Sequence, residues 1–168
     1  LFPDIPVALR RIDGHALLVN QKALDMAGID NNTKIKGGTI IKNNGKLTGV
    51  LVDSPISMVT SILPKPSMDN KIAALKDAEK IAFENGLTTV SVAGIGKEDI
   101  YLIDSLQKAG ELQIRVYAMI SNNKENMDHF LTNGPIKTNK LNVSSFKIYA
   151  DGALGSRGAA LKAPYSDL

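Results

Sequence analysis

The chain has 168 residues, of which 43% are hydrophobic and 22% are charged, and its formal net charge is +3. This balance excludes an intrinsically disordered chain, and the scattered lysines form no basic patch of the kind that binds nucleic acid. Cysteine is absent, which excludes disulfides and metal sites built from thiolates.

Residues 1–60 predict small elements of mixed type. We expect a short strand at 5–12, followed by a turn at Asp13-Gly14-His15. A short helix comes next, because Asn20 suits its N-cap and Gly28 is placed to end it.

A hairpin is expected in the second half of this segment. Two apolar stretches, 39–42 and 47–52, flank Asn43-Asn44-Gly45-Lys46. Asn-Gly between two apolar strands favours a tight antiparallel turn. The segment is therefore predicted to combine small elements with one β-hairpin.

Residues 61–168 predict an alternation of helices and strands. Helices are expected at 67–85, 97–109 and 124–132, and strands at 87–93, 114–120 and 143–150. This alternation is typical of a parallel α/β sheet. Three βα units are too few to close an eight-stranded barrel, which takes about 250 residues. We therefore expect either an open sheet or an arc of a barrel.

Two charged residues stand near the end of the last predicted strand, where parallel α/β proteins gather their active sites. Alternation along the strand predicts an apolar face suited to packing under helices, with Phe146, Ile148 and Ala150, and an opposite face with Lys147, Tyr149 and Asp151. Lys147 and Asp151 are the predicted catalytic pair. An ion pair that serves only the fold explains the same spacing equally well.

A glycine-rich loop at 152–158 follows this strand. Its glycines permit close approach of the backbone to another group. Ser156 and Arg157 offer hydrogen-bond donors to an anionic or carbonyl group, so they are predicted to bind substrate. The spacing matches neither a phosphate-binding P-loop nor the dinucleotide fingerprint.

The chain has two histidines, far apart in the sequence. His15 lies in the turn after the first predicted strand, where it could contact substrate, although a histidine there more often caps or packs a turn. His129 is expected on a solvated helix face. Two distant histidines without cysteine cannot supply the three or so protein ligands of a catalytic metal site. If a metal belongs here, most of its ligands lie outside this chain.

Five stretches, in order along the chain, carry one resemblance: 7–15, 19–24 with 27–29, 86–90, 147–157 and 164–165. They resemble the YtcJ-like branch of the metal-dependent amidohydrolases, the amidohydrolase family 3 group that includes N-substituted formamide deformylases. The most specific of them is Lys147-Ile148-Tyr149-Ala150-Asp151-Gly152-Ala153-Leu154-Gly155-Ser156-Arg157.

The resemblance implies a (β/α)₈ barrel with a centre of one or two metal ions, usually zinc, that hydrolyses an amide or formamide C–N bond with a metal-activated water. It implies that Lys147 ends the fourth barrel strand as a metal ligand, which CO₂ can carboxylate so that it bridges two metals. Asp151 and the loop at 152–158 would hold Lys147, and His15 would contact substrate. Residues 1–60 would be an insertion between barrel strands one and two, and residues 61–168 would contain strands two to four.

The resemblance also places the other metal ligands outside the chain, with a His-x-His before Leu1 and further histidines and a catalytic aspartate after Leu168. Within the chain, Val92 stands where relatives commonly carry an aspartate. We therefore expect an internal fragment of a longer enzyme. Alone, it should be inactive, bind metal poorly and self-associate through open sheet edges.

The expected partner of the longer protein is a small amide, with neither nucleic acid nor membrane. No apolar run reaches the ~20 residues that a membrane-spanning helix needs. No signal peptide is recognised, which favours a cytoplasmic location without establishing it. Two other hypotheses stay open: a non-catalytic α/β binding or assembly domain, and an anion-binding protein that uses the loop Gly155-Ser156-Arg157-Gly158.

Overall fold

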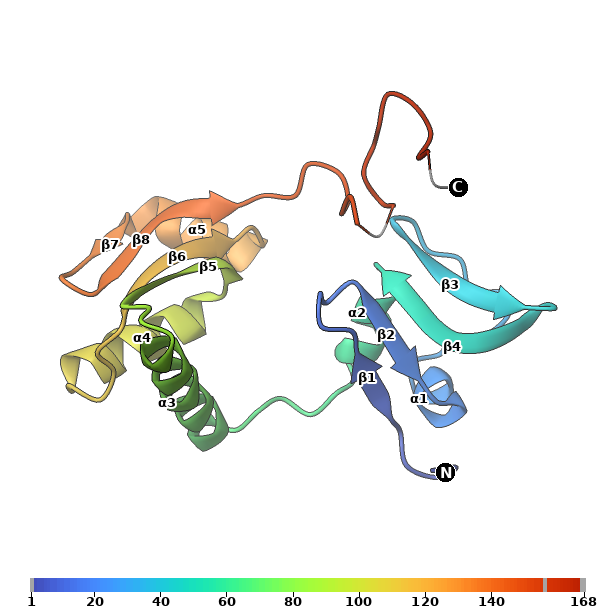
Figure 1. The fold of residues 1–168 in the computed structure, drawn as a ribbon, viewed down its shortest axis with the longest axis horizontal. Helices are drawn as coiled ribbons and strands as arrows, with labels where there is room; N and C mark the ends of the chain where they lie inside the picture. The colour runs from blue at the N-terminus through green and yellow to red at the C-terminus, as the bar shows by residue number, and fades with distance from the viewer. Residues whose placement is uncertain (1, 156, 167–168) are drawn as a thin grey trace. The chain divides into compact units, whose positions relative to one another are not determined.

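The computed structural model describes residues 2–155 and 157–166, which group into two compact units (Figure 1). The N-terminal unit comprises Leu1–Lys65 together with Ala150–Leu168, and the central unit comprises Pro66–Tyr149. The sequence alone groups residues 61–168 together, whereas contacts join the segment from Ala150 onward to the N-terminal unit.

The N-terminal unit is built on an antiparallel sheet of four strands in the order β1-β2-β4-β3. Its elements are β1 (Ala8–Arg10), β2 (Ala16–Val19), α1 (Gln21–Met26), β3 (Gly38–Asn43), β4 (Lys46–Asp53) and α2 (Ile56–Thr60). The predicted hairpin is β3–β4, and its turn has positive φ at Asn44 (48°) and Gly45 (76°), as a tight hairpin turn requires.

Asn20 fixes the entry to α1, as its sequence position predicts. Its side chain accepts hydrogen bonds from the backbone N–H of Ala23 at 3.1 Å and of Val7 at 3.0 Å. Its amide group donates to the carbonyl oxygens of Phe2 and Ile5, each at 2.8 Å. One side chain therefore caps the helix and holds the segment that leads into β1.

The central unit contains a sheet in the order β5-β6-β8-β7. Its elements are α3 (Met68–Glu84), β5 (Thr89–Ile95), α4 (Lys97–Lys108), β6 (Arg115–Ser121), α5 (Lys124–Asn133), β7 (Ile136–Lys137) and β8 (Leu141–Lys147). Strands β5, β6 and β8 are parallel, and β7 runs antiparallel to β8. The predicted α/β alternation is confirmed, including Ser67 as the N-cap of α3.

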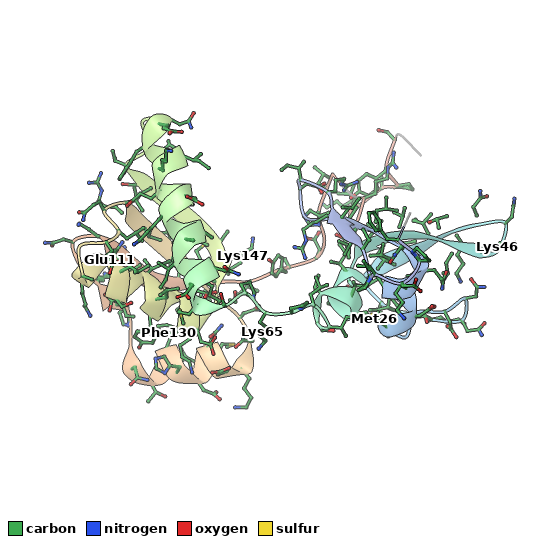
Figure 2. All side chains as sticks on the ribbon, turned by 90° about the horizontal axis from the view of Figure 1, so that it is seen from below. Met26, Lys46, Lys65, Glu111, Phe130 and Lys147 are labelled. Carbon is green, nitrogen blue, oxygen red and sulfur yellow. The ribbon has the colours of Figure 1, made fainter. Side chains whose placement is uncertain are left out.

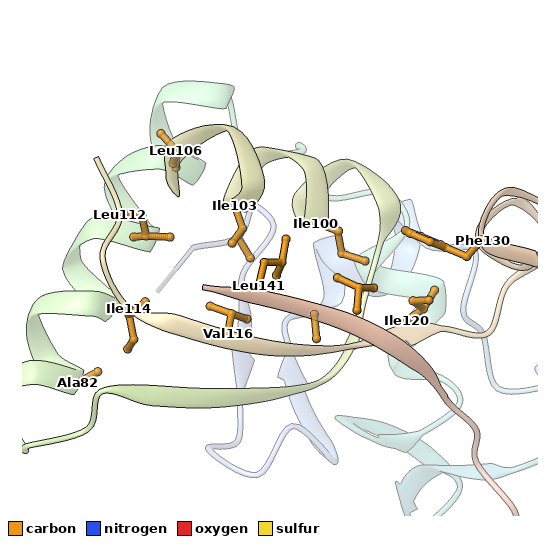
Figure 3. Close-up of a cluster of buried hydrophobic side chains, with 12 residues drawn as sticks. Ala82, Ile100, Ile103, Leu106, Leu112, Ile114, Val116, Ile120, Phe130 and Leu141 are labelled. Carbon is orange, nitrogen blue, oxygen red and sulfur yellow. The ribbon is translucent and has the colours of Figure 1, made fainter. Parts of the chain in front are cut away.

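The core of the central unit lies between its helices and one face of its sheet (Figure 3). Its fully or nearly buried members are Ala82, Ile100, Ile103, Leu106, Leu112, Ile114, Val116, Ala118, Ile120, Phe130, Leu141 and Val143. The helices α3, α4 and α5 all contribute to it, so all three cover the same face. Across the part of the chain that the structure describes, no helix is long and apolar enough to cross a membrane.

The end of β8 differs from the sequence prediction. The strand stops at Lys147, which pairs with Ser121 at the end of β6, so no neighbouring strand remains to extend the ladder. Ile148 is 68% exposed and Ala150 is also exposed. The expectation that both pack under helices is therefore wrong, and only Phe146 of that predicted face contacts the core.

Candidate functional site

Strand β8 contains a bulge before it reaches Lys147. Its neighbour β6 advances by two residues, from Tyr117 to Met119, while β8 advances by three, from Asn142 to Ser145. The extra residue changes which side chains of β8 point to which face of the sheet.

This bulge decides where Lys147 points. Leu141 and Val143, before the bulge, and Phe146, after it, all contact the core under the helices. In a regular strand Lys147 would share the face of Leu141 and Val143, because alternate residues point the same way. With the bulge, all three apolar side chains face the helices and Lys147 lies on the opposite, open face, at the carboxyl end of the parallel strands. Its side chain is labelled in Figure 2.

Strand β5 also has an irregularity, at the same carboxyl end of the parallel strands. The register of β5 against β6 shifts between Ala93 and Ile95, and the intervening Gly94 has a φ of 109°. A Cβ atom at Gly94 would lie 3.5 Å from Cγ of Lys147 and 3.5 Å from Oγ of Ser121. The aliphatic part of the lysine therefore lies against the bare backbone of Gly94.

Lys147 has an aromatic neighbour, and a pair of hydroxyl groups lies further along this face. Its ammonium nitrogen lies 4.9 Å from the centroid of the Tyr149 ring, which is a cation–π contact. Further along the face, the hydroxyl groups of Tyr117 and Ser145 are 2.8 Å apart and hydrogen-bonded. An ammonium group has no lone pair for a metal, so Lys147 can be a ligand only after it loses a proton or forms a carbamate.

A complete metal centre is not formed by the residues described. Over residues 2–155 and 157–166, no group of three or more histidine, aspartate or glutamate side chains is arranged to hold a metal ion. Lys147 fits one ligand position of the centre that the resemblance implies, and these residues supply no set of three to join it.

In the N-terminal unit, His15 pairs with an aspartate that the sequence did not single out. Nδ1 of His15 lies 2.7 Å from Oδ1 of Asp53, and the backbone N–H of Asp53 donates to the carbonyl oxygen of His15 at 3.1 Å. Asp53 ends β4, and His15 directly precedes β2, which pairs Ala16 with Val52. This strand register is the signal that would have identified Asp53, and it required β2, which the sequence did not predict.

Asp13 holds the other side of this turn. Its Oδ1 accepts a hydrogen bond from the backbone N–H of His15 at 3.0 Å, and its carboxylate pairs with Arg11 at 2.7 Å. The hydrogen bond from Arg11, and then that from the His15 backbone, lower the pKa of Asp13 from 3.8 to about 2. The same contact with Asp13 raises the pKa of Arg11.

The glycine-rich loop closes on itself beside Asp53. The backbone N–H of Gly158 donates to the carbonyl of Ala153 at 3.0 Å, and a Cβ at Gly158 would lie 3.3 Å from Oδ2 of Asp53. At the base of the loop, Oδ2 of Asp151 accepts from the backbone N–H of Ala160 at 3.0 Å. This contact gives Asp151 a structural role in closing the loop.

The predicted site residues thus fall into two groups. His15 contacts Asp53, Gly158 lies beside Asp53, and Asp151 closes the base of the same loop; all of them belong to the N-terminal unit. Lys147 belongs to the central unit. Ser156 lies outside the described residues.

The second histidine has a different environment. His129 is half-buried on α5, and its Nε2 lies 2.8 Å from the hydroxyl of Tyr101 on α4. The rings of Tyr101 and Phe130 both meet it edge-on, at centroid distances of 5.7 and 5.0 Å. These contacts tie α4 to α5, so His129 has a packing role.

Similar proteins identify the family. Residues 1–167 match the model of the amidohydrolase family. The chain is 34% identical over 174 residues to the putative amidohydrolase YtcJ of Bacillus subtilis, covering 99% of this chain and 32% of that protein. It is 31% identical over 181 residues to the protein LONG AFTER FAR-RED 3 of Arabidopsis thaliana, covering 98% of this chain and 31% of that protein. The chain thus spans about a third of these relatives.

Solved structures share the fold. A crystal structure of an uncharacterized metal-dependent hydrolase from Pyrococcus horikoshii matches with a TM-score of 0.68 at 24% identity, over 98% of this chain and 32% of that one. Its counterpart from Pyrococcus furiosus gives 0.66 at 23% identity, over 98% of this chain and 34% of that one. The match to the family model, which takes in both units and the Lys147 strand, shows that the chain belongs to the amidohydrolase family.

Proposed function

We propose that this chain is part of a metal-dependent amidohydrolase and that it contributes Lys147 to the metal centre of the longer enzyme. The observation that carries the proposal is the position of Lys147, on the open face of the sheet at the carboxyl end of three parallel strands. Active sites of parallel α/β enzymes lie at the carboxyl ends of the strands. Membership of the amidohydrolase family and the metal-dependent hydrolases among the similar structures support it.

The central unit is proposed to be an arc of a (β/α)₈ barrel. Its helices cover one face of β5, β6 and β8, and the opposite face carries polar side chains, which suits the interior of a barrel near its active-site end. In this assignment β5, β6 and β8 are barrel strands two to four. Residues 1–60 are the insertion between strands one and two, and 61–168 contain the partial barrel.

The proposed reaction is hydrolysis of a C–N bond in a small amide or formamide. A divalent metal, zinc in our proposal, would bind at the carboxyl ends of the parallel strands. Lys147 would be one ligand, and the remaining ligands would come from outside the described residues. His15 and the donors of Ser156 and Arg157 would contact the substrate. Asp151 would hold the loop that forms the wall beside them.

Zinc titration by calorimetry tests the ligand assignment. The 168-residue chain should show no tight stoichiometric zinc binding, because the residues that the structure describes supply no set of three ligands; tight binding would contradict the proposal. In the longer enzyme, Lys147→Arg should abolish formamide hydrolysis, since a guanidinium keeps the charge but forms no such carbamate. Mass spectrometry of the variant should also lack the mass of one CO₂ that a carbamate on Lys147 would add. Full activity in that variant would exclude Lys147 as a ligand.

A non-catalytic α/β binding or assembly domain is the second candidate. It is favoured by the lack of a set of three metal-binding side chains in the part of the chain that the structure describes. The flanking sequence separates the two candidates, because a longer protein without a His-x-His upstream and without histidines downstream could not form the metal centre.

The isolated chain is also proposed to self-associate. Strand β5 forms one edge of the central sheet, and β1 and β3 form the two edges of the other. Exposed strand edges are ready to pair with a second chain. Light scattering should show species larger than a monomer, and a clean monomer over a wide concentration range would contradict this.

A further inference from the structure

The contact between His15 and Asp53 leaves one side of the imidazole open. Nδ1 is held by Oδ1 of Asp53 at 2.7 Å. Within the part of the chain that the structure describes, Nε2 of His15 has no hydrogen-bond partner. The histidine side chain is 42% exposed while that of Asp53 is 20% exposed, so the carboxylate is the more enclosed member.

The chemistry of the pair decides the tautomer. An ionised carboxylate only accepts hydrogen bonds, so Nδ1 of a neutral imidazole beside it must carry the hydrogen. Nε2 then has a free lone pair that points away from Asp53. A histidine fixed in this way is an acceptor for an N–H group, and a second group that sets the tautomer is a common device in enzyme sites.

The backbone holds Asp53 in an uncommon conformation. Its φ is 57°, in the left-handed region that few residues other than glycine adopt and that aspartate tolerates better than most. Asp53 is the last residue of β4, where it pairs with Gly38 and its carboxylate contacts His15. Strained residues of this kind gather at binding sites, where the surrounding structure keeps them in place.

We propose that Asp53 is the positioning residue of a binding site in which Nε2 of His15 accepts a hydrogen bond from the N–H of a small amide. The carboxylate sets the tautomer, and Gly158 lies beside its other oxygen. Only the identity of the ligand rests on the proposed amidohydrolase function. The geometry of the pair does not depend on a metal.

Nitrogen NMR of the imidazole rings tests the positioning role in the 168-residue chain. The two histidines give two easily assigned sets of signals. In its neutral form, the His15 ring of the unsubstituted chain should carry hydrogen on Nδ1 rather than Nε2, a bias of about tenfold or more given the strength of a hydrogen bond to a charged group. His129 serves as the internal reference.

Two substitutions remove the carboxylate in different ways. Asp53→Asn keeps the shape and tolerates the left-handed backbone, and Asp53→Gly removes the side chain and relieves the backbone strain. Both should reduce the bias at His15 severalfold and leave His129 unchanged. Asp13→Asn is the matched control, because Asp13 contacts only the backbone of His15 and should leave the ring tautomer as it was.

A titration with N-methylformamide tests the ligand. Its N–H should shift the Nε2 signal of His15 in the unsubstituted chain and in Asp13→Asn, and the shift should shrink severalfold in Asp53→Gly. The positioning role of Asp53 would be overturned if the His15 ring carried its hydrogen on Nε2, or if its tautomer stayed the same in both Asp53 variants. A correct tautomer without any response to the amide would overturn the ligand assignment, and neither result touches the proposed role of Lys147.

Discussion

Each unit of this chain has a buried apolar core, and the N-terminal unit in addition brings its backbone close to other groups. In the central unit, side chains from three helices pack against one face of the sheet, and Ile100, Ala118 and Val143 are fully buried. In the N-terminal unit, the backbone itself comes close to other groups. Every glycine at which a Cβ would come within 3.0 Å of another atom belongs to this unit: Gly37, Gly38, Gly49 and Gly152.

This difference extends to the two groups of site residues. Lys147 is placed by apolar packing, since the bulge in β8 lets Phe146 join the core while the lysine faces away. His15 and Asp53 are placed by backbone pairing between β2 and β4. Both units should therefore be sensitive to lost side-chain volume, and the N-terminal unit should also be sensitive to a side chain added at its closely approached glycines.

Removing volume from the central core should have the largest effect. Leu141 is 1% exposed, so Leu141→Ala should lower the free energy of unfolding of the central unit by about 2–5 kcal/mol through lost burial and the cavity left behind. Urea unfolding followed by amide exchange measures it unit by unit. Leu131→Ala is the control, because Leu131 is 69% exposed and its loss should cost no more than about 0.5 kcal/mol. Equal losses of unfolding free energy in the two variants would show that burial of Leu141 does not set the cost.

Adding one methyl group should break the N-terminal sheet. A Cβ at Gly49 would lie 2.1 Å from the carbonyl oxygen of Val19, and Gly49 has a φ of 83°. Gly49→Ala should cost about 2–4 kcal/mol, because the clash adds to the strain of a positive φ. Gly45→Ala, with a φ of 76° and open space around it, should cost only about 1–2 kcal/mol. Thermal unfolding of both variants measures the difference, and similar melting temperatures would argue against the close approach.

A methyl group at Gly94 should disturb Lys147 rather than the fold. The nearest atoms to a Cβ there are 3.5 Å away, so the cost is the strain of a φ of 109°, about 1–2 kcal/mol. The NMR signals of the Lys147 side chain and their contacts with the Tyr149 ring should change. Gly110→Ala carries a similar strain, with a φ of 75° and nothing nearby, and should leave those signals unaltered. If both variants act alike on Lys147, Gly94 has no special relation to it.

The smallest effect should come from acid. The pKa of Asp13 is about 2 in the folded chain against an ordinary 3.8. A lowered folded pKa adds stability that is present above 3.8 and is lost as the pH falls toward 2. The contribution is small because the carboxylate is exposed to solvent. Carboxyl NMR should show the pKa of Asp13 rising in Arg11→Ala, while an unchanged titration would assign the shift to other groups.

Local signals in the sequence predicted most of the central unit. Ser67 caps its helix, and the apolar spacing of α4 places Ile103 and Leu106 in the core as expected. The hairpin at Asn44-Gly45 was equally clear, because the turn and its conformation depend on neighbouring residues alone. These features are encoded within a few residues of where they occur.

The features that the sequence did not predict depend on distant partners. Strand β2 has no alternation of polar and apolar residues and becomes a strand because β1 and β4 flank it. The end of β8 depends on where β6 ends, and the pairing of His15 with Asp53 depends on a register across 38 residues. For the same reason the sequence singled out His15 as a candidate but not the aspartate that contacts it. The role of Lys147 in metal binding stays a prediction.

The bulge in β8 has a consequence for comparing and engineering relatives of this chain. At this point Val143 and Ser144 of β8 lie opposite the single residue Ala118 of β6, and Ser144 is the exposed one of the two. A relative that lacks one residue here could form a regular strand and still direct the lysine to the same face. The loss of one residue at the bulge is therefore compatible with an unchanged site, whereas one residue inserted between Phe146 and Lys147 would turn the lysine toward the helices.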